Sequence, residues 1–476
     1  MLDQQISPID PNDRSVRSLR IITVAALFSL FFIIIPTLCG AGIIRDHYIN
    51  QLGRYICFAI AAIGIDLIWG YTGLLSLGQA FFFCLGAYAM AMHLALPQGG
   101  GDVRPEYNMI PQFMFFNNVH SLDHAPFWIP FRSRAFAISA GIFLPAIVAS
   151  IFGFFIFRSR VRGVYFSIIT QAVAWGAWLL VSRNEMLLGG TNGLTNFYKP
   201  LNQSKPWILT LYLASLTMLT MAYLACRWIT RSSLGRVLVA VRDRETRLYF
   251  SGYRPYRFKV FAFAVAAVLA AIGGMLYAPQ MGIITPARMK VEESIMMVIW
   301  VALGGRGRLW GAIFGALLVN YTYSMLTSDM PSAWPFIQGG MFLAVVLLFP
   351  QGCVVLWDRI EEQVAKRAGA LAILAAAGPL LAISLFILLE ALGLMPHALR
   401  QDVRGIQPKY ILLVLAIGGS AQGDRAAPRL RRGPQRVRPN RRLEAARGVV
   451  HGGRAACLRG RSGGAVQRTR GHRCRL

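Results

Sequence analysis

The sequence contains few charged residues for its length. Only 15% of the 476 residues are Asp, Glu, Lys or Arg, whereas soluble domains carry about 25%. Hydrophobic residues make up 55% of the chain, and the mean hydropathy is +0.49. This composition excludes an ordinary soluble enzyme, because there is too little charge to solvate a surface of that size. It also excludes a disordered chain, so an integral membrane protein remains.

Motifs for catalysis and for metal binding are also missing. None of the seven cysteines forms a CxxC pair, and the seven histidines show no HExxH or other metal-ligand spacing. The sequence has no Walker A motif, no GxSxG and no EF-hand loop. We therefore expect no enzyme, no metal and no cofactor bound by this chain. Five cysteines lie in or beside apolar segments, where a free thiol packs as a small hydrophobic group.

Acidic residues are scarce, and the formal net charge is +28, but half of this charge lies in the last eighth of the chain. Residues 421–476 contain sixteen arginines, no lysine and two acids, without hydrophobic periodicity. One interpretation is a reading-frame disruption in GC-rich coding DNA, and this is the one we favour. The other is a disordered polybasic tail that binds anionic lipid or nucleic acid. On the favoured interpretation, nucleic acid is not an expected partner.

Long apolar runs predict an all-α, polytopic membrane protein with about ten transmembrane helices. A bilayer core about 30 Å thick requires about 20 helical residues. One run, residues 294–303, is too short, which leaves open a half-helix, a re-entrant segment or a span completed by its neighbours. Residues 368–394 are a possible additional span. The ten predicted spans are residues 20–44, 55–73, 76–96, 134–157, 164–182, 207–229, 258–281, 294–303, 311–326 and 336–357.

The distribution of Lys and Arg predicts the orientation. Basic clusters lie before the first span, after the fourth, in residues 227–259 and after the tenth, and alternating spans place all of them on the cytoplasmic side. Residues 45–54, 97–133, 183–206 and 282–293 are then outer loops. The aromatic-rich loop 97–133 is either an ordered cap or a docking surface for an external protein. The predicted organisation is a cytoplasmic arm (1–19), a membrane domain (20–357), an additional apolar region (358–420) and the Arg-rich tail (421–476).

Polar and small residues interrupt the apolar runs at a few places. Residues 70–79 (GYTGLLSLGQ) are either a membrane-depth interruption of the kind that transporters use for substrates or a tight cytoplasmic turn. Asp66 is the one acid well inside a predicted span, whereas Glu292 and Glu293 stand at a span entrance and are expected to be solvated. Gly307, Gly311 and Gly315 recur every four residues, which predicts one helix face for close packing.

A short amphipathic helix is predicted in the longest cytoplasmic loop. Leu234, Val237, Leu238 and Val241 follow the i, i+3, i+4, i+7 spacing of one helix face. Basic residues occupy the other faces. The helix either lies on the membrane surface or inserts into a groove of a partner protein.

Five segments together resemble the permease subunits of bacterial ABC importers for branched-chain amino acids and urea. The resemblance covers roughly residues 20–357. Within that family, residues 66–73 (DLIWGYTG), the IWVALGG run and the long loop 97–133 are closer to the urea-type permease. The segments are residues 69–79 (WGYTGLLSLGQ), 189–195 (GGTNGLT), 233–243 (SLGRVLVAVRD), 273–278 (GGMLYA) and 299–307 (IWVALGGRG).

The resemblance implies a multi-pass protein of the bacterial inner membrane that works in a heteromeric importer. Its implied partners are cytosolic ABC ATPase subunits, which use the ATP, a second homologous permease, a periplasmic solute-binding protein and membrane lipid. Residues of the amphipathic helix would form the ATPase-coupling helix, and polar residues at two places would line the pathway of a neutral polar solute. The coupling residues are Ser233, Leu234, Gly235, Arg236, Val237, Leu238, Val241, Arg242 and Asp243; the pathway residues are Tyr71, Thr72, Ser76 and Gln79, with Thr191 and Asn192 at the outer mouth.

Two alternatives to a urea or small-amide importer stay open. One is a branched-chain amino acid permease of the same family. The other belongs to a different class: an ATPase-independent channel or carrier. An ion-coupled carrier usually needs titratable groups at mid-membrane, and the sequence offers little beyond Asp66. A passive pore needs none.

Overall fold

The computed structural model describes residues 31–32, 35–36, 46–97, 110–111, 113–114, 125–159, 161, 163–195, 205–329, 336 and 339–340. The chain divides into two units, Met1–Arg400 and Gln401–Leu476, and the described residues all belong to the first. Nearly all of the predicted spans 20–44 and 336–357, the possible span 368–394 and the Arg-rich tail lie outside the described residues.

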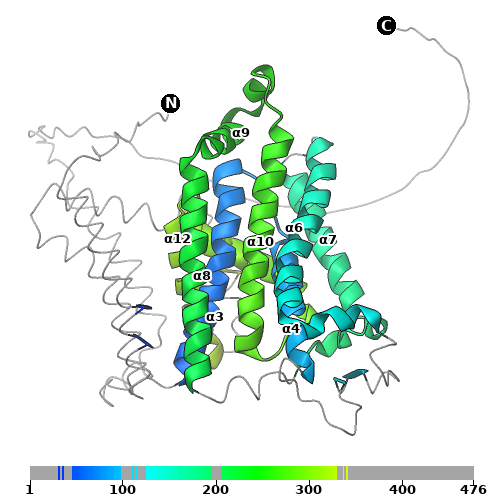
Figure 1. Cartoon of the computed structure of the whole chain (residues 1–476). Coiled ribbons are helices and arrows are strands. Elements are labelled where there is room, and N and C mark those ends of the chain that lie inside the picture. The colour runs from blue at the N-terminus through cyan, green and yellow to red at the C-terminus, as the bar shows by residue number, and fades with distance from the viewer. Residues whose placement is uncertain are drawn as a thin grey trace, which may run out of the picture. The chain divides into compact units, whose positions relative to one another are not determined.

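The described part is helical and contains several apolar helices that are long enough to cross a bilayer (Figure 1). The prediction of an all-α, polytopic membrane protein is confirmed. Helices α6, α7, α8 and α10 match predicted spans to within three residues at each end. The membrane helices are α3 (Asp46–Asp66) with its π-helical continuation η2 (Leu67–Thr72), α4 (Gln79–Ala95), α6 (Arg134–Arg158), α7 (Val164–Val181), α8 (Lys205–Arg231), α10 (Pro255–Met281), α11 (Val291–Gly304) and α12 (Leu309–Asp329).

Helix α10 lies at the centre of the bundle, between α3, α4 and α6 (Figure 1). It packs closely because its buried faces carry alanine and glycine. A methyl group on Gly273 would stand 2.6 Å from the carbonyl oxygen of Cys57 on α3, and one on Gly86 of α4 would collide with the backbone at Ala271. Small residues let helix backbones approach in a membrane, where van der Waals packing replaces the hydrophobic effect between helices.

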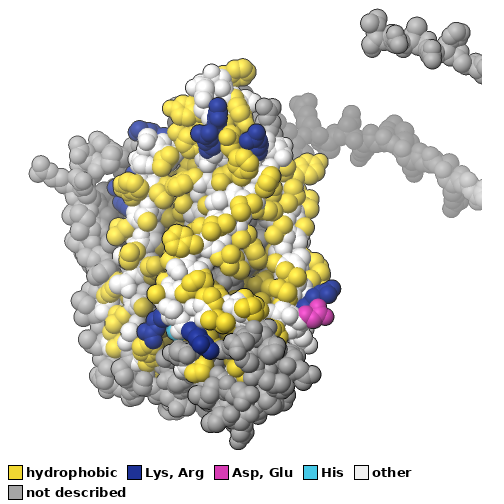
Figure 2. Space-filling view, turned by 45° about the vertical axis from the view of Figure 1, so that its right-hand side comes forward, with side chains coloured by type: hydrophobic (Ala, Val, Ile, Leu, Met, Phe, Trp, Pro, Cys, Tyr) yellow, Lys and Arg dark blue, Asp and Glu magenta, His cyan; other side chains and the backbone are white. Residues whose placement is uncertain are grey.

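The outward surface of helices α6 and α7 is apolar. Helices α6 and α7 expose large apolar side chains such as Phe143, Ile151 and Ile168, more than half of whose surface is accessible. Figure 2 shows hydrophobic side chains across the middle of the face it presents, with Lys and Arg toward its two ends. This is the pattern of a lipid-facing surface, because charged side chains avoid the hydrocarbon core.

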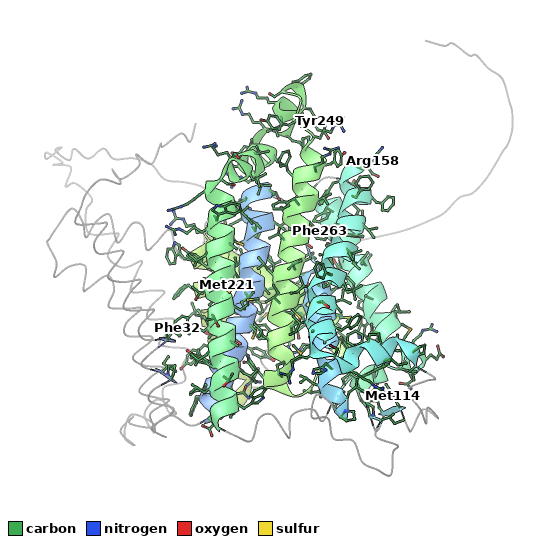
Figure 3. The ribbon with its side chains drawn as sticks, in the orientation of Figure 1. Phe32, Met114, Arg158, Met221, Tyr249 and Phe263 are labelled. Carbon is green, nitrogen blue, oxygen red and sulfur yellow. The ribbon has the colours of Figure 1, made fainter. Side chains whose placement is uncertain are left out.

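The orientation predicted from Lys and Arg agrees with the arrangement of the helix ends. Arg158, at the end of α6, lies at the same end of the bundle as Tyr249 of the cytoplasmic helix α9 (Ser233–Phe250) (Figure 3). Met114, from the predicted outer loop 97–133, lies at the opposite end. The loop is described only in part: its Trp128 is fully buried and donates its indole N–H to the carbonyl of Leu187.

The prediction that residues 45–54 form a loop is wrong, because α3 begins at Asp46 and includes nearly all of this segment. Helix α3 and η2 together run for 27 residues, about 40 Å, which exceeds the hydrocarbon thickness of about 30 Å. Polar residues such as Gln51 and Arg54 therefore continue the helix beyond the apolar stretch. Hydropathy marks only the part of a helix that lies in lipid, so it missed the first turns.

The prediction that Gly307, Gly311 and Gly315 share one helix face is wrong for Gly307. Helix α11 ends at Gly304 and α12 begins at Leu309, and Gly307 lies in the turn between them with φ of 81°. Gly311 and Gly315 do lie on α12, where an added methyl group would collide with the facing helix α11 at Gly315. Four-residue spacing does not reveal that a turn, which glycine also favours, separates the first residue from the others.

Candidate functional site

A break in the helical backbone separates η2 from α4. Gly73 adopts a left-handed conformation with φ of 74°, and residues 74–78 are not helical. The freed backbone groups find partners on neighbouring helices: the Ser167 hydroxyl of α7 donates to the Leu75 carbonyl at 2.6 Å, and the Leu77 amide donates to Thr170 Oγ1 at 3.1 Å. Buried protein partners of this kind are what allow non-helical backbone at membrane depth.

The predicted pathway residues near the break are mostly buried. Thr72, Ser76 and Gln79 are at most 3% exposed, and Tyr71 is half-buried. The Thr72 hydroxyl donates to the Ile68 carbonyl at 2.6 Å, whereas neither polar atom of the Gln79 amide has a hydrogen-bond partner among the described residues. The pathway role of these side chains stays a prediction.

The two predicted outer-mouth residues lie elsewhere. Thr191 and Asn192 are exposed on the short helix η8 (Gly190–Asn192), which follows the outer end of α7, whereas the break packs against the first turns of α7. Leu194 and Ile284 exchange two backbone hydrogen bonds of 2.9 Å, which fix this loop to the segment before α11. The structure therefore does not bring the two predicted sets together.

A cytoplasmic junction forms where η2 meets the turn between α11 and α12. Asp66 Oδ1 accepts the Gly307 amide at 2.6 Å, and the Arg306 guanidinium lies 5.3 Å from the centre of the Trp69 ring. Asp66 is fully buried. A methyl group on Gly70 would stand 2.5 Å from the Gly307 nitrogen, so only glycine permits this approach.

The amphipathic helix α9 lies on this junction (Figures 1 and 3). Gly235, Leu238 and Val241 are buried, and Leu234 and Val237 are half-buried, so the apolar face contacts this chain. Helix α9 packs against α8, α10 and η2. Polar residues of the predicted coupling set, Ser233, Arg236, Arg242 and Asp243, are exposed.

Arg242 connects α9 to η2, just before the break. Its Nη1 donates to the Gly70 carbonyl at 2.6 Å, and its Nε donates to Asp243 Oδ1 at 2.8 Å. Lys259 of α10 forms an ion pair of 2.7 Å with Glu245, which fixes the second half of α9. These contacts join α9 to η2 and α10.

A pocket of about 250 Å³ lies between α3, α10, α11, α12 and the short helix η9 (Pro286–Met289). None of the predicted pathway residues lines it. Sequence reasoning missed this pocket, although paired acids and isolated arginines at span entrances gave a weak signal. Its lining residues are Gln51, Arg54, Tyr55, Phe58, Tyr277, Arg288, Glu292, Glu293, Met296, Trp300, Asn320, Tyr323 and Ser324.

The pocket has charges of both signs and an aromatic wall. Arg288 Nη1 donates to Glu293 Oε1 at 2.9 Å. Burial alone lowers the pKa of the Arg288 guanidinium, but Tyr277 and the carboxylate of Glu293 raise it above its usual range, so the guanidinium stays charged. The expectation that Glu293 is simply solvated is wrong, because this carboxylate is half-buried in an ion pair. No cluster of potential metal ligands occurs among the described residues.

A bundle of apolar helices with an interrupted membrane segment, a polar pocket and a basic cytoplasmic helix defines a multi-pass membrane transport protein. Residues 48–346 match the family model described as the permease component of the branched-chain amino acid transport system. The match covers more than half of the chain, which therefore belongs to this permease family. It is an inner-membrane transport component and not an enzyme.

Curated relatives are similar over much of this region. The chain is 25% identical to the high-affinity branched-chain amino acid transport system permease protein LivM of Escherichia coli (strain K12), over 62% of this chain and 67% of LivM. It is 26% identical to the autoinducer 2 import system permease protein LsrC of Yersinia pestis (strain Pestoides F), over 46% of this chain and 63% of LsrC. No solved structure matches.

Proposed function

We propose that this chain is the permease subunit of an ATP-driven ABC importer that carries urea or a similar small amide across the inner membrane. Its partners in this proposal are cytosolic ABC ATPases that bind and hydrolyse ATP, a second homologous permease and a periplasmic solute-binding protein. The observation that carries the proposal is the contact between α9 and the helix break. This cytoplasmic helix exposes one basic face, and its Arg242 donates to the Gly70 carbonyl. It is therefore suited to receive a movement from a cytosolic ATPase and to pass it to the membrane helices.

The preference for a small amide rests on the sequence. Residues 66–73 and the IWVALGG run are similar to the urea-type permeases of the family. The structure adds that the two segments lie close together at the cytoplasmic junction, because Asp66 of the first accepts the amide of Gly307, the second residue after the IWVALGG run. A branched-chain amino acid is the second candidate, and the match to LivM supports it.

The test is transport by purified components in liposomes. We expect ATP-dependent uptake of radiolabelled urea by the complete assembly of this chain, its partner permease, the ATPases and the binding protein. Labelled leucine is the competing substrate in a parallel reaction, and its uptake in place of urea would assign the amino acid. Liposomes that contain this chain alone are the essential control: uptake without ATPases would overturn the proposal in favour of a channel or carrier.

A further inference from the structure

We infer that the pocket between α3, α10, α11 and α12 is an outer binding site for a small solute that presents an acceptor oxygen at one end and N–H donors at the other. This inference deepens the proposed function and rests on it. Amides and amino acids share this chemistry. None of the predicted pathway residues at the helix break lines this pocket.

The position of the pocket suits an entrance from the outside. Its α3 residues, Gln51 to Phe58, lie in the first half of a helix that starts at the outer end and reaches the cytoplasmic junction at Asp66. Its α12 residues, Asn320 to Ser324, lie in the second half of the helix that returns to the outer side. Arg288 of η9 and the two acids Glu292 and Glu293 at the start of α11 also line the pocket.

The size of the pocket limits the ligand. Its volume of about 250 Å³ is below the roughly 300–1,000 Å³ of sites for drug-sized molecules. The ring of Phe58 lies 5.1 Å from that of Tyr277 and 5.1 Å from that of Trp300, centre to centre. These rings form an apolar wall that accepts a planar amide group or a short aliphatic side chain.

Two buried donors in the pocket lining lack an acceptor. Arg54 Nε and Trp300 Nε1 have no hydrogen-bond partner among the described residues. Trp300 itself is 2% exposed. A buried donor without an acceptor is unfavourable, so an incoming carbonyl or carboxylate oxygen that reaches either group recovers part of that cost.

Acceptors for N–H groups lie beside these donors. Glu293 is held by Arg288, whereas Glu292 is exposed and has no ion-pair partner among the described residues. A carboxylate of this kind accepts the N–H₂ groups of an amide or the ammonium group of an amino acid. Since Arg54 and Arg288 carry the opposite charge, the pocket matches a ligand that is neutral overall but polar at both ends.

The first experiment measures occupancy directly. Glu292→Cys is prepared in the full chain within the assembled importer, and its reaction with a charged thiol reagent is followed with and without urea, acetamide or leucine, each at a concentration high enough to offset the weaker binding expected when the Glu292 carboxylate is lost. The three described native cysteines are buried, and the same labelling of the unmodified importer is subtracted as background. Glu185→Cys, which replaces an outer carboxylate that is 82% exposed, is the matched control. We expect the solute to slow labelling at position 292 at least threefold and to leave position 185 unchanged.

The second experiment measures the contribution to transport. Trp300→Phe keeps an aromatic ring but removes the N–H donor together with the five-membered ring, and Glu292→Gln removes the charge at nearly constant volume. We expect the KM of ATP-driven uptake to rise about fivefold for the first and about tenfold for the second, as for loss of one neutral and one charge-assisted hydrogen bond. Glu185→Gln is expected to leave KM unchanged.

The outcomes separate the two levels of the proposal. If the unmodified importer carries neither amides nor leucine with ATP, the proposed function fails. If it transports but position 292 shows no protection and the variants match Glu185→Gln, the pocket is not the binding site, while the importer function stands. Protection by urea and acetamide alone assigns an amide, and protection by leucine alone assigns an amino acid.

Discussion

Replacement of Arg242 tests whether α9 transmits movement to the membrane. Arg242→Ala removes the hydrogen bond of 2.6 Å to the Gly70 carbonyl and also the contact with Asp243, while it leaves the buried face of α9 intact. A hydrogen bond from a charged donor contributes about 1.5–3 kcal/mol. Because 38% of the side chain is exposed, we expect the lower part of this range.

A loss of about 1.5 kcal/mol in the coupling between α9 and the break corresponds to roughly a tenfold change in the linked equilibrium. We therefore expect ATP-driven solute uptake by Arg242→Ala to fall about tenfold. The ATPase rate and the assembly of the complex should stay within twofold of the unmodified importer, since the exposed face of α9 is otherwise unchanged. Uptake and ATP hydrolysis are measured on the same liposomes.

Two matched variants make this result interpretable. Arg242→Lys retains a cation that is able to reach the Gly70 carbonyl, so it should recover part of the uptake. Arg158→Ala removes an arginine at the cytoplasmic end of α6, where it lies 5.4 Å from the Phe154 ring, and should have no effect on uptake. Normal uptake by Arg242→Ala would refute the reasoning. Equal loss of ATPase binding and uptake would show that Arg242 serves docking and does not transmit movement.

Further predictions concern the junction and the orientation. Gly70→Ala places a methyl group 2.5 Å from backbone and carboxylate atoms, so it should lower the free energy of unfolding in detergent by about 1–3 kcal/mol. Gly176→Ala is the control, because there is open space around Gly176, and it should not change stability. Equal melting curves for the two variants would contradict the packing. Asp66→Ala leaves a buried backbone amide without its acceptor and should destabilise by a similar amount, with normal stability as the contrary result. Ser233→Cys should react with an impermeant thiol reagent only from the cytoplasmic side and Thr191→Cys only from outside; the reverse labelling would invert the topology.

Much of the membrane fold follows from the sequence, because lipid imposes a simple requirement. A helix satisfies its own backbone hydrogen bonds, and with about 20 apolar residues it crosses the bilayer at a low cost in free energy. Helices α6, α7 and α10 therefore end within three residues of the predicted spans. The short helix α11 was visible as an incomplete span. Polar ends, such as the first turns of α3, carry no hydropathy signal and were missed.

The amphipathic helix α9 was predictable for a similar reason. Its apolar spacing and basic flanks are local properties of residues 233–243, so the sequence indicates a helix on the cytoplasmic side. The sequence does not show that Arg242 contacts Gly70, 172 residues earlier in the chain. Such a contact depends on how η2 and α9 pack, which no local pattern encodes.

Taken alone, the sequence determined that this chain is a helical membrane protein without a catalytic or nucleotide motif, and it predicts which end faces the cytoplasm. Composition and charge suffice for that, because the bilayer acts on each segment separately. Only the tertiary structure decided where polar groups converge. Arg54 comes from α3, whereas Glu292 and Trp300 come from α11, far along the chain, and they line one pocket because the small residues of α10 and α12 let these helices pack closely.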